Sequence, residues 1–130
     1  MNHYFITGTS RGLGKAIAEL LLEQPGNMVT GYSRNRTIDH PNYCHVEIDL
    51  GDLDKVKSLT FEPVISPEKI VLINNSGTLG AVKHIGGVDA ETLENACNVN
   101  LVAPMIMTNN FIKAYREVEA EKIIISVSSG

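Results

Sequence analysis

The fold of this chain is decided at Thr7-Gly8-Thr9-Ser10-Arg11-Gly12-Leu13-Gly14, which links an apolar run at residues 4–7 to a helical pattern. This order of strand, turn and helix places the unpaired N–H groups and partial positive charge of a helix N-terminus beside a strand end, where an anion binds favourably. Gly8 permits the tight turn, Gly12 the close approach of a diphosphate, and Gly14 close packing of the helix on the strand. A glycine-rich turn without a ligand is the alternative.

Outward from this segment, short apolar runs alternate with helical patterns, as expected for β–α units on a parallel sheet covered on both faces. The run at residues 70–73 is apolar at every position, which favours a strand buried on both sides. The pattern predicts one α/β domain over residues 1–130. Its strands are expected at residues 4–7, 28–32, 43–48, 70–73 and 123–127.

The helices between these strands are predicted from apolar residues three and four positions apart. The inner face of the first helix is expected to hold Leu13, Ala16, Ile17, Leu20 and Leu21. Asp52 is a candidate N-cap for a short helix that ends near Thr60. The longest helix is expected over residues 90–116, with an interruption at Pro104. Its inner face is expected to hold Leu93, Ala96, Cys97 and Leu101.

The Thr-Gly-x-x-x-Gly-x-Gly spacing of residues 7–14 resembles the nucleotide-binding motif of the short-chain dehydrogenase/reductase family. Asp49-Leu50 matches the family's pair that contacts the adenine amine, and Asn74-Asn75-Ser76-Gly77 matches its Asn-Asn-Ala-Gly with Ser76 in place of alanine. Asn100 matches the asparagine that holds a water in a proton relay. Ser128-Ser129-Gly130 lies where the family carries its catalytic serine. Taken singly, each landmark also has an explanation as an ordinary turn or cap.

The resemblance covers the whole chain and implies a Rossmann-type fold. That fold has three layers and a parallel sheet of about five strands in the order 3-2-1-4-5. Within the family, residues 7–14, 100–105 and 127–130 look most like bacterial benzil and sepiapterin reductases. Complete relatives continue past the catalytic serine, so the resemblance implies that the chain is the truncated N-terminal part of a longer member.

Charge after the second strand bears on the choice of cofactor. NAD-preferring relatives carry an acid there, which accepts hydrogen bonds from the ribose 2'-hydroxyl and repels a 2'-phosphate. Here the position is Ser33, followed by Arg34, and Arg11 precedes Gly12, so two guanidinium groups can clamp a phosphate. We therefore expect NADP(H). The alternatives are that both arginines are solvated, or that Arg36 substitutes. The expected cofactor-binding residues are Gly8, Thr9, Ser10, Arg11, Gly12, Leu13, Gly14, Ser33, Arg34, Asp49, Leu50, Asn75, Ser76 and Gly77.

The resemblance also implies a reaction, the NADPH-dependent reduction of a small ketone or aldehyde. Ser129 is expected to hydrogen-bond the carbonyl oxygen, with Ser128 as the fallback, and Asn100 to hold the relay water. The family also needs a tyrosine followed four residues later by a lysine, which lowers the pKa of the phenol. In relatives this pair lies about a dozen residues past the serine. We therefore expect it beyond residue 130 and the chain alone to be inactive.

A rival hypothesis is a non-catalytic NADP(H)-binding module that senses redox state or scaffolds a partner, since function belongs to the site and not to the fold. No Tyr-x-x-x-Lys pair is available within the chain, because four residues after Tyr32 stands Arg36 and four residues after Tyr115 stands Glu119. A flavodoxin-like or receiver domain is disfavoured. Such a domain has no need of paired arginines beside a glycine turn.

Charge and composition restrict the other function classes. The 11 basic and 15 acidic side chains are scattered and give a formal net charge of −4, so neither nucleic acid nor a membrane is expected as a partner. Cys44 and Cys97 form no Cys-x-x-Cys pair and no leader is recognisable, which favours the cytoplasm. Cys97 is interpreted as a core residue. No metal site is expected, because the histidines are dispersed at positions 3, 40, 45 and 84.

Self-association is expected as well. If relatives continue with a helix and two strands that this chain lacks, apolar surface should be exposed around Leu101, Met105 and Phe111. The full-length form is expected to be a homo-oligomer, and the isolated chain marginally stable, aggregating or paired with another copy.

Overall fold

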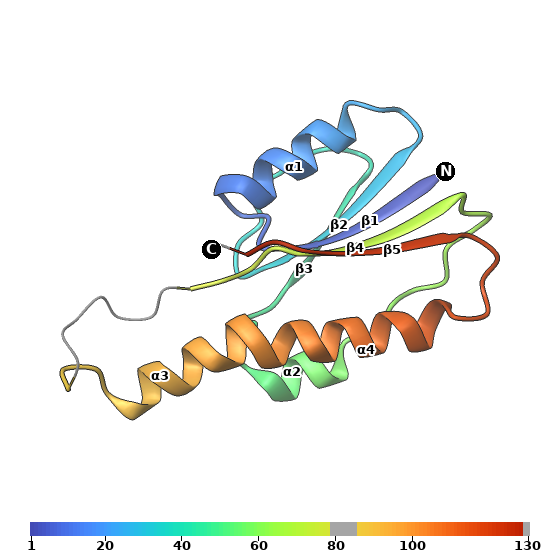
Figure 1. Ribbon diagram of the computed structural model, residues 1–130. Coiled ribbons are helices and arrows are strands. Elements are labelled where there is room, and N and C mark those ends of the chain that lie inside the picture. Colours follow the sequence, from blue (N-terminus) through green and yellow to red (C-terminus); the bar gives the residue numbers. More distant parts are fainter. Residues whose placement is uncertain (79–85, 129–130) are drawn as a thin grey trace.

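A parallel sheet forms the central layer of the protein (Figure 1). The computed structural model describes residues 1–78 and 86–128, and within them the sheet has five strands in the order β3-β2-β1-β4-β5. All neighbouring strands pair in parallel. The predicted strand order is therefore confirmed. The strands are β1 (Asn2–Thr7), β2 (Asn27–Ser33), β3 (Tyr43–Glu47), β4 (Lys69–Asn74) and β5 (Glu121–Ser126).

Helices lie on both faces of the sheet. On one face lies α1 (Gly12–Leu22), and on the other lie α2 (Leu53–Ser58) and α4 (Ala103–Tyr115) (Figure 1). The carboxylate of Asp52 accepts a hydrogen bond from the Lys55 N–H at 3.4 Å, so the predicted N-cap of α2 is confirmed. A further helix, α3 (Ala90–Cys97), extends past the carboxyl edge of the sheet.

Each face of the sheet has its own apolar core, because successive residues of a strand point to opposite faces. On the α1 face, Ile6 and Val29 pack with Ala18. On the α4 face, Phe5 packs with Phe111, and the rings of these two meet edge to face with centroids 6.2 Å apart. The interior strand β4 is covered on both sides, which explains why its residues 70–73 are all apolar.

The buried face of α1 differs from the prediction by one residue. Leu13 is 56% exposed, and Ala16 and Leu20 are exposed as well. The residues that face the sheet are Gly14, Ile17, Ala18, Leu21 and Leu22. The spacing is the same, but the register is set by Gly14. Only a residue without a Cβ fits at this position, because an added Cβ would lie 2.1 Å from the Gly8 carbonyl oxygen.

The predicted inner face of the long helix is wrong. Leu93, Cys97 and Leu101 are exposed, so Cys97 is not a core residue. The buried positions belong to α4 and recur every four residues, at Ala103, Met107, Phe111 and Tyr115. The reason is positional: α3 lies past the edge of the sheet and buries none of its residues, whereas α4 lies against the sheet.

A π-helical turn, η1 (Asn98–Val102), separates α3 from α4. In it the Ala103 N–H donates to the Asn98 carbonyl, five residues back. Pro104 stands in the first turn of α4 and has no N–H to give to the carbonyl four residues earlier. The predicted interruption is therefore a widened turn just before the proline.

Several exposed apolar side chains lie on η1, α4 and β5. Leu101 and Met105 are 56% and 62% exposed, as predicted, but Phe111 is only 1% exposed and belongs to the core. Ile124 and Ile125 of the edge strand β5 are also exposed. Among residues 1–78 and 86–128, no helix combines the length and apolar character that crossing a membrane requires.

Candidate functional site

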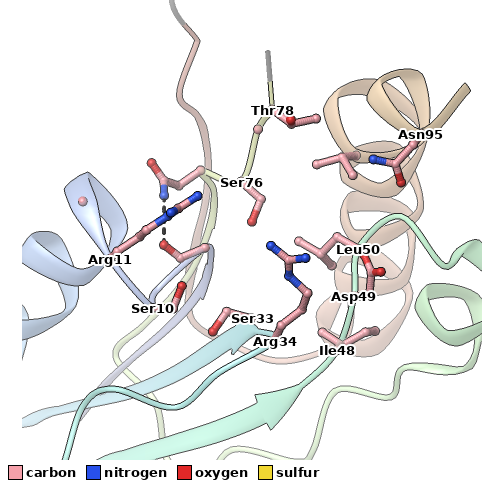
Figure 2. Close-up of a pocket in the computed structure, with 15 residues that line it drawn as sticks. Ser10, Arg11, Ser33, Arg34, Ile48, Asp49, Leu50, Ser76, Thr78 and Asn95 are labelled. Atoms are coloured by element: carbon pink, nitrogen blue, oxygen red, sulfur yellow. Dashed lines mark hydrogen bonds between the residues drawn. The ribbon is translucent and has the colours of Figure 1, made fainter. Parts of the chain in front are cut away.

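A pocket of about 460 Å³ opens at the carboxyl edge of the sheet (Figure 2). Its walls come from the segments that follow β1, β2, β3 and β4, together with one side of α3 and η1. Open parallel sheets bind ligands at this edge. The lining residues are Gly8, Ser10, Arg11, Gly12, Ser33, Arg34, Ile48, Asp49, Leu50, Asn75, Ser76, Gly77, Thr78, Asn95 and Val99.

The glycine turn forms one wall of the pocket. Gly8 has a φ of +78°, and its N–H donates to the Tyr32 carbonyl at 2.8 Å, so the chain turns directly at the end of β1. Gly12 has a φ of +60°, and a Cβ added to it would meet no atom within 4 Å, which leaves its pocket side open. Arg11 occupies the N-cap of the α1 helix that begins there, and its side chain makes no capping hydrogen bond. The helix N-terminus can therefore accept an anion.

Thr7 joins the glycine turn to the segment after β4. Its hydroxyl oxygen accepts hydrogen bonds from the N–H groups of Asn75 and Ser76, at 2.9 and 3.0 Å. The Asn75 amide in turn donates to the Gly8 carbonyl at 3.4 Å. These contacts hold the two pocket walls together across β1 and β4.

We expect Thr7→Val to destabilise the protein by about 2 kcal/mol, because the change leaves the N–H groups of the half-buried Asn75 and Ser76 without their acceptor. Urea unfolding followed by circular dichroism measures the effect. Thr60→Val is the control, since Thr60 is exposed and should respond little. A Thr7→Val protein as stable as the parent would show that these hydrogen bonds contribute nothing.

The charged side chains of the pocket are Arg11, Arg34 and Asp49. In Figure 2, Arg34 extends toward Ser76 and Leu50 while Arg11 lies on the α1 side. Among the described residues, the guanidinium groups of Arg11 and Arg34 have neither an ion pair nor a hydrogen-bond partner. Two uncompensated guanidinium groups beside an uncapped helix favour a ligand that carries several negative charges.

Arg36, the sequence-based alternative to these arginines, is engaged elsewhere. Its Nε donates to the Ile38 carbonyl at 3.0 Å, and its guanidinium lies over the Tyr43 ring, 5.8 Å from the centroid. It does not line the pocket.

The opposite wall of the pocket is built around Asp49 and Leu50. One carboxylate oxygen of Asp49 accepts from the Gly51 N–H at 2.8 Å, which fixes the turn after β3. A Cβ on Gly51 would lie 2.2 Å from the Asn95 side-chain oxygen, so α3 approaches this turn closely. The pocket is also lined by four residues that were not predicted from the sequence: Ile48, Thr78, Asn95 and Val99. The spacing of Asn95 and Val99, one helical turn apart just before Asn100, is the signal that would have found two of them.

Three of the predicted cofactor-binding residues lie outside the pocket lining: Thr9, Leu13 and Gly14. Thr9 is only 1% exposed, and its hydroxyl bonds to that of Tyr43 at 2.8 Å. Leu13 points to solvent, and Gly14 packs against Gly8. The other predicted cofactor-binding residues are brought together as one lining.

The predicted catalytic residues lie beside this pocket or outside the described structure. The Asn100 side chain accepts from the Thr78 N–H at 2.8 Å and donates to the Thr78 carbonyl at 2.7 Å. It thereby ties η1 to the segment after β4, and π-helical turns are often found at functional sites. Ser129 lies outside the described residues, whereas the fallback Ser128 is described and exposed just after β5.

Comparisons with known proteins agree with this geometry. Residues 2–130 match the family model described as short chain dehydrogenase. A benzil reductase ((S)-benzoin forming) of Bacillus cereus is 35% identical over all of this chain and 57% of its own length. A short-chain dehydrogenase/reductase of Burkholderia vietnamiensis has a TM-score of 0.85 and 26% identity, over 99% of this chain and 66% of that one.

A third similar structure is that of 4-hydroxyisoleucine dehydrogenase complexed with NADH and succinate. Its TM-score is 0.76 at 23% identity, over 97% of this chain and 58% of that one, so it shows the likeness of fold alone. The chain spans about half the length of the curated relatives it matches.

Proposed function

Since this chain belongs to the short-chain dehydrogenase family, we propose that its pocket binds NADP(H) and that the protein reduces a small ketone or aldehyde with it. When bound, the cofactor would supply a hydride for the carbonyl carbon. The observation that carries the proposal is the pair of guanidinium groups of Arg11 and Arg34, which have no partner within residues 1–78 and 86–128 and line the pocket beside the start of α1.

Each wall of the pocket would have a separate task. The open N–H groups at Gly12 would hold the diphosphate, and Arg11 and Arg34 would bind the 2'-phosphate from two sides. Asp49 and Leu50 would contact the adenine, and Asn95 and Val99 would line the pocket beside it. The segment at residues 75–78, held by Thr7 and Asn100, would lead from the diphosphate toward the nicotinamide end of the cofactor.

The catalytic part of the proposal rests on fewer residues. Ser129, or Ser128 in its place, would hydrogen-bond the carbonyl oxygen, and Asn100 would hold a relay water. No tyrosine of this sequence has a lysine four residues after it. We therefore propose that these 130 residues bind the cofactor without reducing a substrate.

A second candidate is a non-catalytic NADP(H)-binding sensor or scaffold, because a fold that binds a nucleotide does not by itself decide the function. A measurement of reductase activity toward benzil in the presence of NADPH, made on the protein to which the chain belongs, distinguishes the reductase from the sensor or scaffold. Oxidation of NADPH supports the reductase. NADPH binding without turnover of any carbonyl supports the sensor.

We also propose that the protein works in the cytoplasm as a homo-oligomer. The two free cysteines, Cys44 and Cys97, are both exposed and suit a reducing compartment. The exposed apolar residues Leu101, Met105 and Ile112 lie on or next to α4 and offer a surface for a second copy.

Titration with reduced cofactors, followed by nicotinamide fluorescence, tests the cofactor proposal. NADPH is expected to bind at least about tenfold more tightly than NADH, since a charge-assisted hydrogen bond to the 2'-phosphate contributes about 1.5–3 kcal/mol. Adenosine 2',5'-bisphosphate should compete better than ADP. Equal affinity for both cofactors, or no binding of either, would overturn the proposal.

A further inference from the structure

A series of hydrogen bonds connects the two segments that carry Arg11 and Arg34, the arginines of the proposed 2'-phosphate site. Tyr43 and His45 are two residues apart in β3, so their side chains lie on the same face of the strand. The Thr9 hydroxyl bonds to the Tyr43 hydroxyl at 2.8 Å, and the Tyr43 hydroxyl bonds to His45 Nδ1 at 2.7 Å. His45 Nε2 then lies 3.1 Å from the Ser33 carbonyl oxygen. This series of hydrogen bonds thus begins in the glycine turn and ends at the residue directly before Arg34.

The direction of each hydrogen bond follows from the Ser33 carbonyl, which can only accept. The Ser33 hydroxyl lies 3.4 Å from Nε2 but donates to the Asn35 carbonyl at 2.9 Å. His45 Nε2 therefore carries the proton, and in the neutral ring Nδ1 accepts from the Tyr43 hydroxyl. The Tyr43 oxygen in turn accepts from the Thr9 hydroxyl. Burial lowers the pKa of His45, which favours the neutral ring, and raises the pKa of Tyr43, which favours the protonated hydroxyl. These are the protonation states that the hydrogen-bond directions require.

Gly31 supplies the space for these side chains. A Cβ on this residue of β2 would lie 2.0 Å from the Tyr43 hydroxyl and 2.3 Å from that of Thr9. The Ser33 carbonyl has one further donor, the Ile48 N–H at 3.0 Å, so it is saturated and fixed. The loop after Ser33 is held again where the Thr37 hydroxyl donates to the Ser10 carbonyl at 2.6 Å.

We propose that His45 is a positioning residue for cofactor selectivity, which holds the Ser33 carbonyl so that Arg34 faces the 2'-phosphate. This inference rests on the proposed binding of NADP(H). His45 does not line the pocket, and it acts through Ser33. Through Ser33 and Arg34, His45 would act on the 2'-phosphate, which NADPH has and NADH lacks.

Replacing His45 by phenylalanine or glutamine tests the proposal. His45→Phe removes both ring nitrogens, and we expect NADPH affinity to fall roughly five- to tenfold while NADH affinity stays within about twofold. His45→Gln keeps an N–H donor near the position of Nε2 and should recover most of the NADPH affinity. Adenosine 2',5'-bisphosphate and ADP, used as competitors, should repeat this difference.

His3→Gln is the matched control for His45→Gln. His3 also bonds a buried neighbour through Nε2, the Thr30 hydroxyl at 2.9 Å, but it stands at the start of β1, away from the pocket. It should change thermal stability without changing the ratio of NADPH to NADH affinity.

The possible outcomes separate the two proposals. A parent protein without preference for NADPH would refute the proposed cofactor itself. A parent that prefers NADPH, with a His45→Phe variant that keeps the same ratio or loses both cofactors equally, would overturn only the role of His45. Failure of His45→Gln to recover NADPH affinity would also count against it.

Discussion

Gly14→Ala is expected to lower NADPH affinity by at least about tenfold and to destabilise the protein by about 2 kcal/mol or more. The added Cβ would lie 2.1 Å from the Gly8 carbonyl oxygen and 2.4 Å from the Asn75 amide, so α1 must move away from the glycine turn. Alanine is favoured over glycine in a helix by up to about 1 kcal/mol, but main-chain overlap outweighs this gain. Cofactor titration and urea unfolding measure the two effects.

Gly26→Ala is the control for this prediction. A Cβ on Gly26 would meet no atom within 4 Å, so the change should alter stability by no more than about 0.5 kcal/mol. It should leave NADPH affinity unchanged. If Gly14→Ala behaved like Gly26→Ala, close contact between α1 and the turn would not be needed for the site.

The sequence predicted the sheet and the glycine turn because both depend on local signals. The apolar run at residues 70–73 is β4 apart from one residue at each end, and residues 7–14 form the expected strand, turn and helix. The register of α1 was missed by one residue because a steric contact between Gly14 and Gly8 sets it, and apolar spacing alone does not reveal such a contact.

Other parts of the site depend on residues far apart in the sequence, which spacing cannot pair. Thr9 stands inside the glycine motif, yet its hydroxyl is buried against Tyr43 from another strand. His45 is one of four dispersed histidines in the sequence, and only the fold brings it to Ser33. Likewise Asn95 becomes a pocket residue because α3 approaches the turn at Gly51.

Arg34→Glu is expected to reverse the cofactor preference. The change removes a guanidinium that would bind the 2'-phosphate and adds a carboxylate that repels it, so NADPH affinity should fall by about 100-fold or more. The same carboxylate can accept a hydrogen bond from the ribose 2'-hydroxyl, so NADH affinity should rise by up to about tenfold. Titration with both reduced cofactors at one fixed salt concentration measures the ratio, because salt screens phosphate contacts.

Arg116→Glu makes the same change of charge at the end of α4, away from the pocket, and should leave the ratio unchanged. It separates a local contact of Arg34 from the effect on the whole protein of losing one positive charge and gaining one negative charge. Because Arg34 has no partner among the described residues, its replacement breaks no hydrogen bond or ion pair there, and stability should change little. A ratio of affinities that stayed the same in Arg34→Glu would mean that Arg34 is a solvated surface residue and that Arg11 alone faces the phosphate.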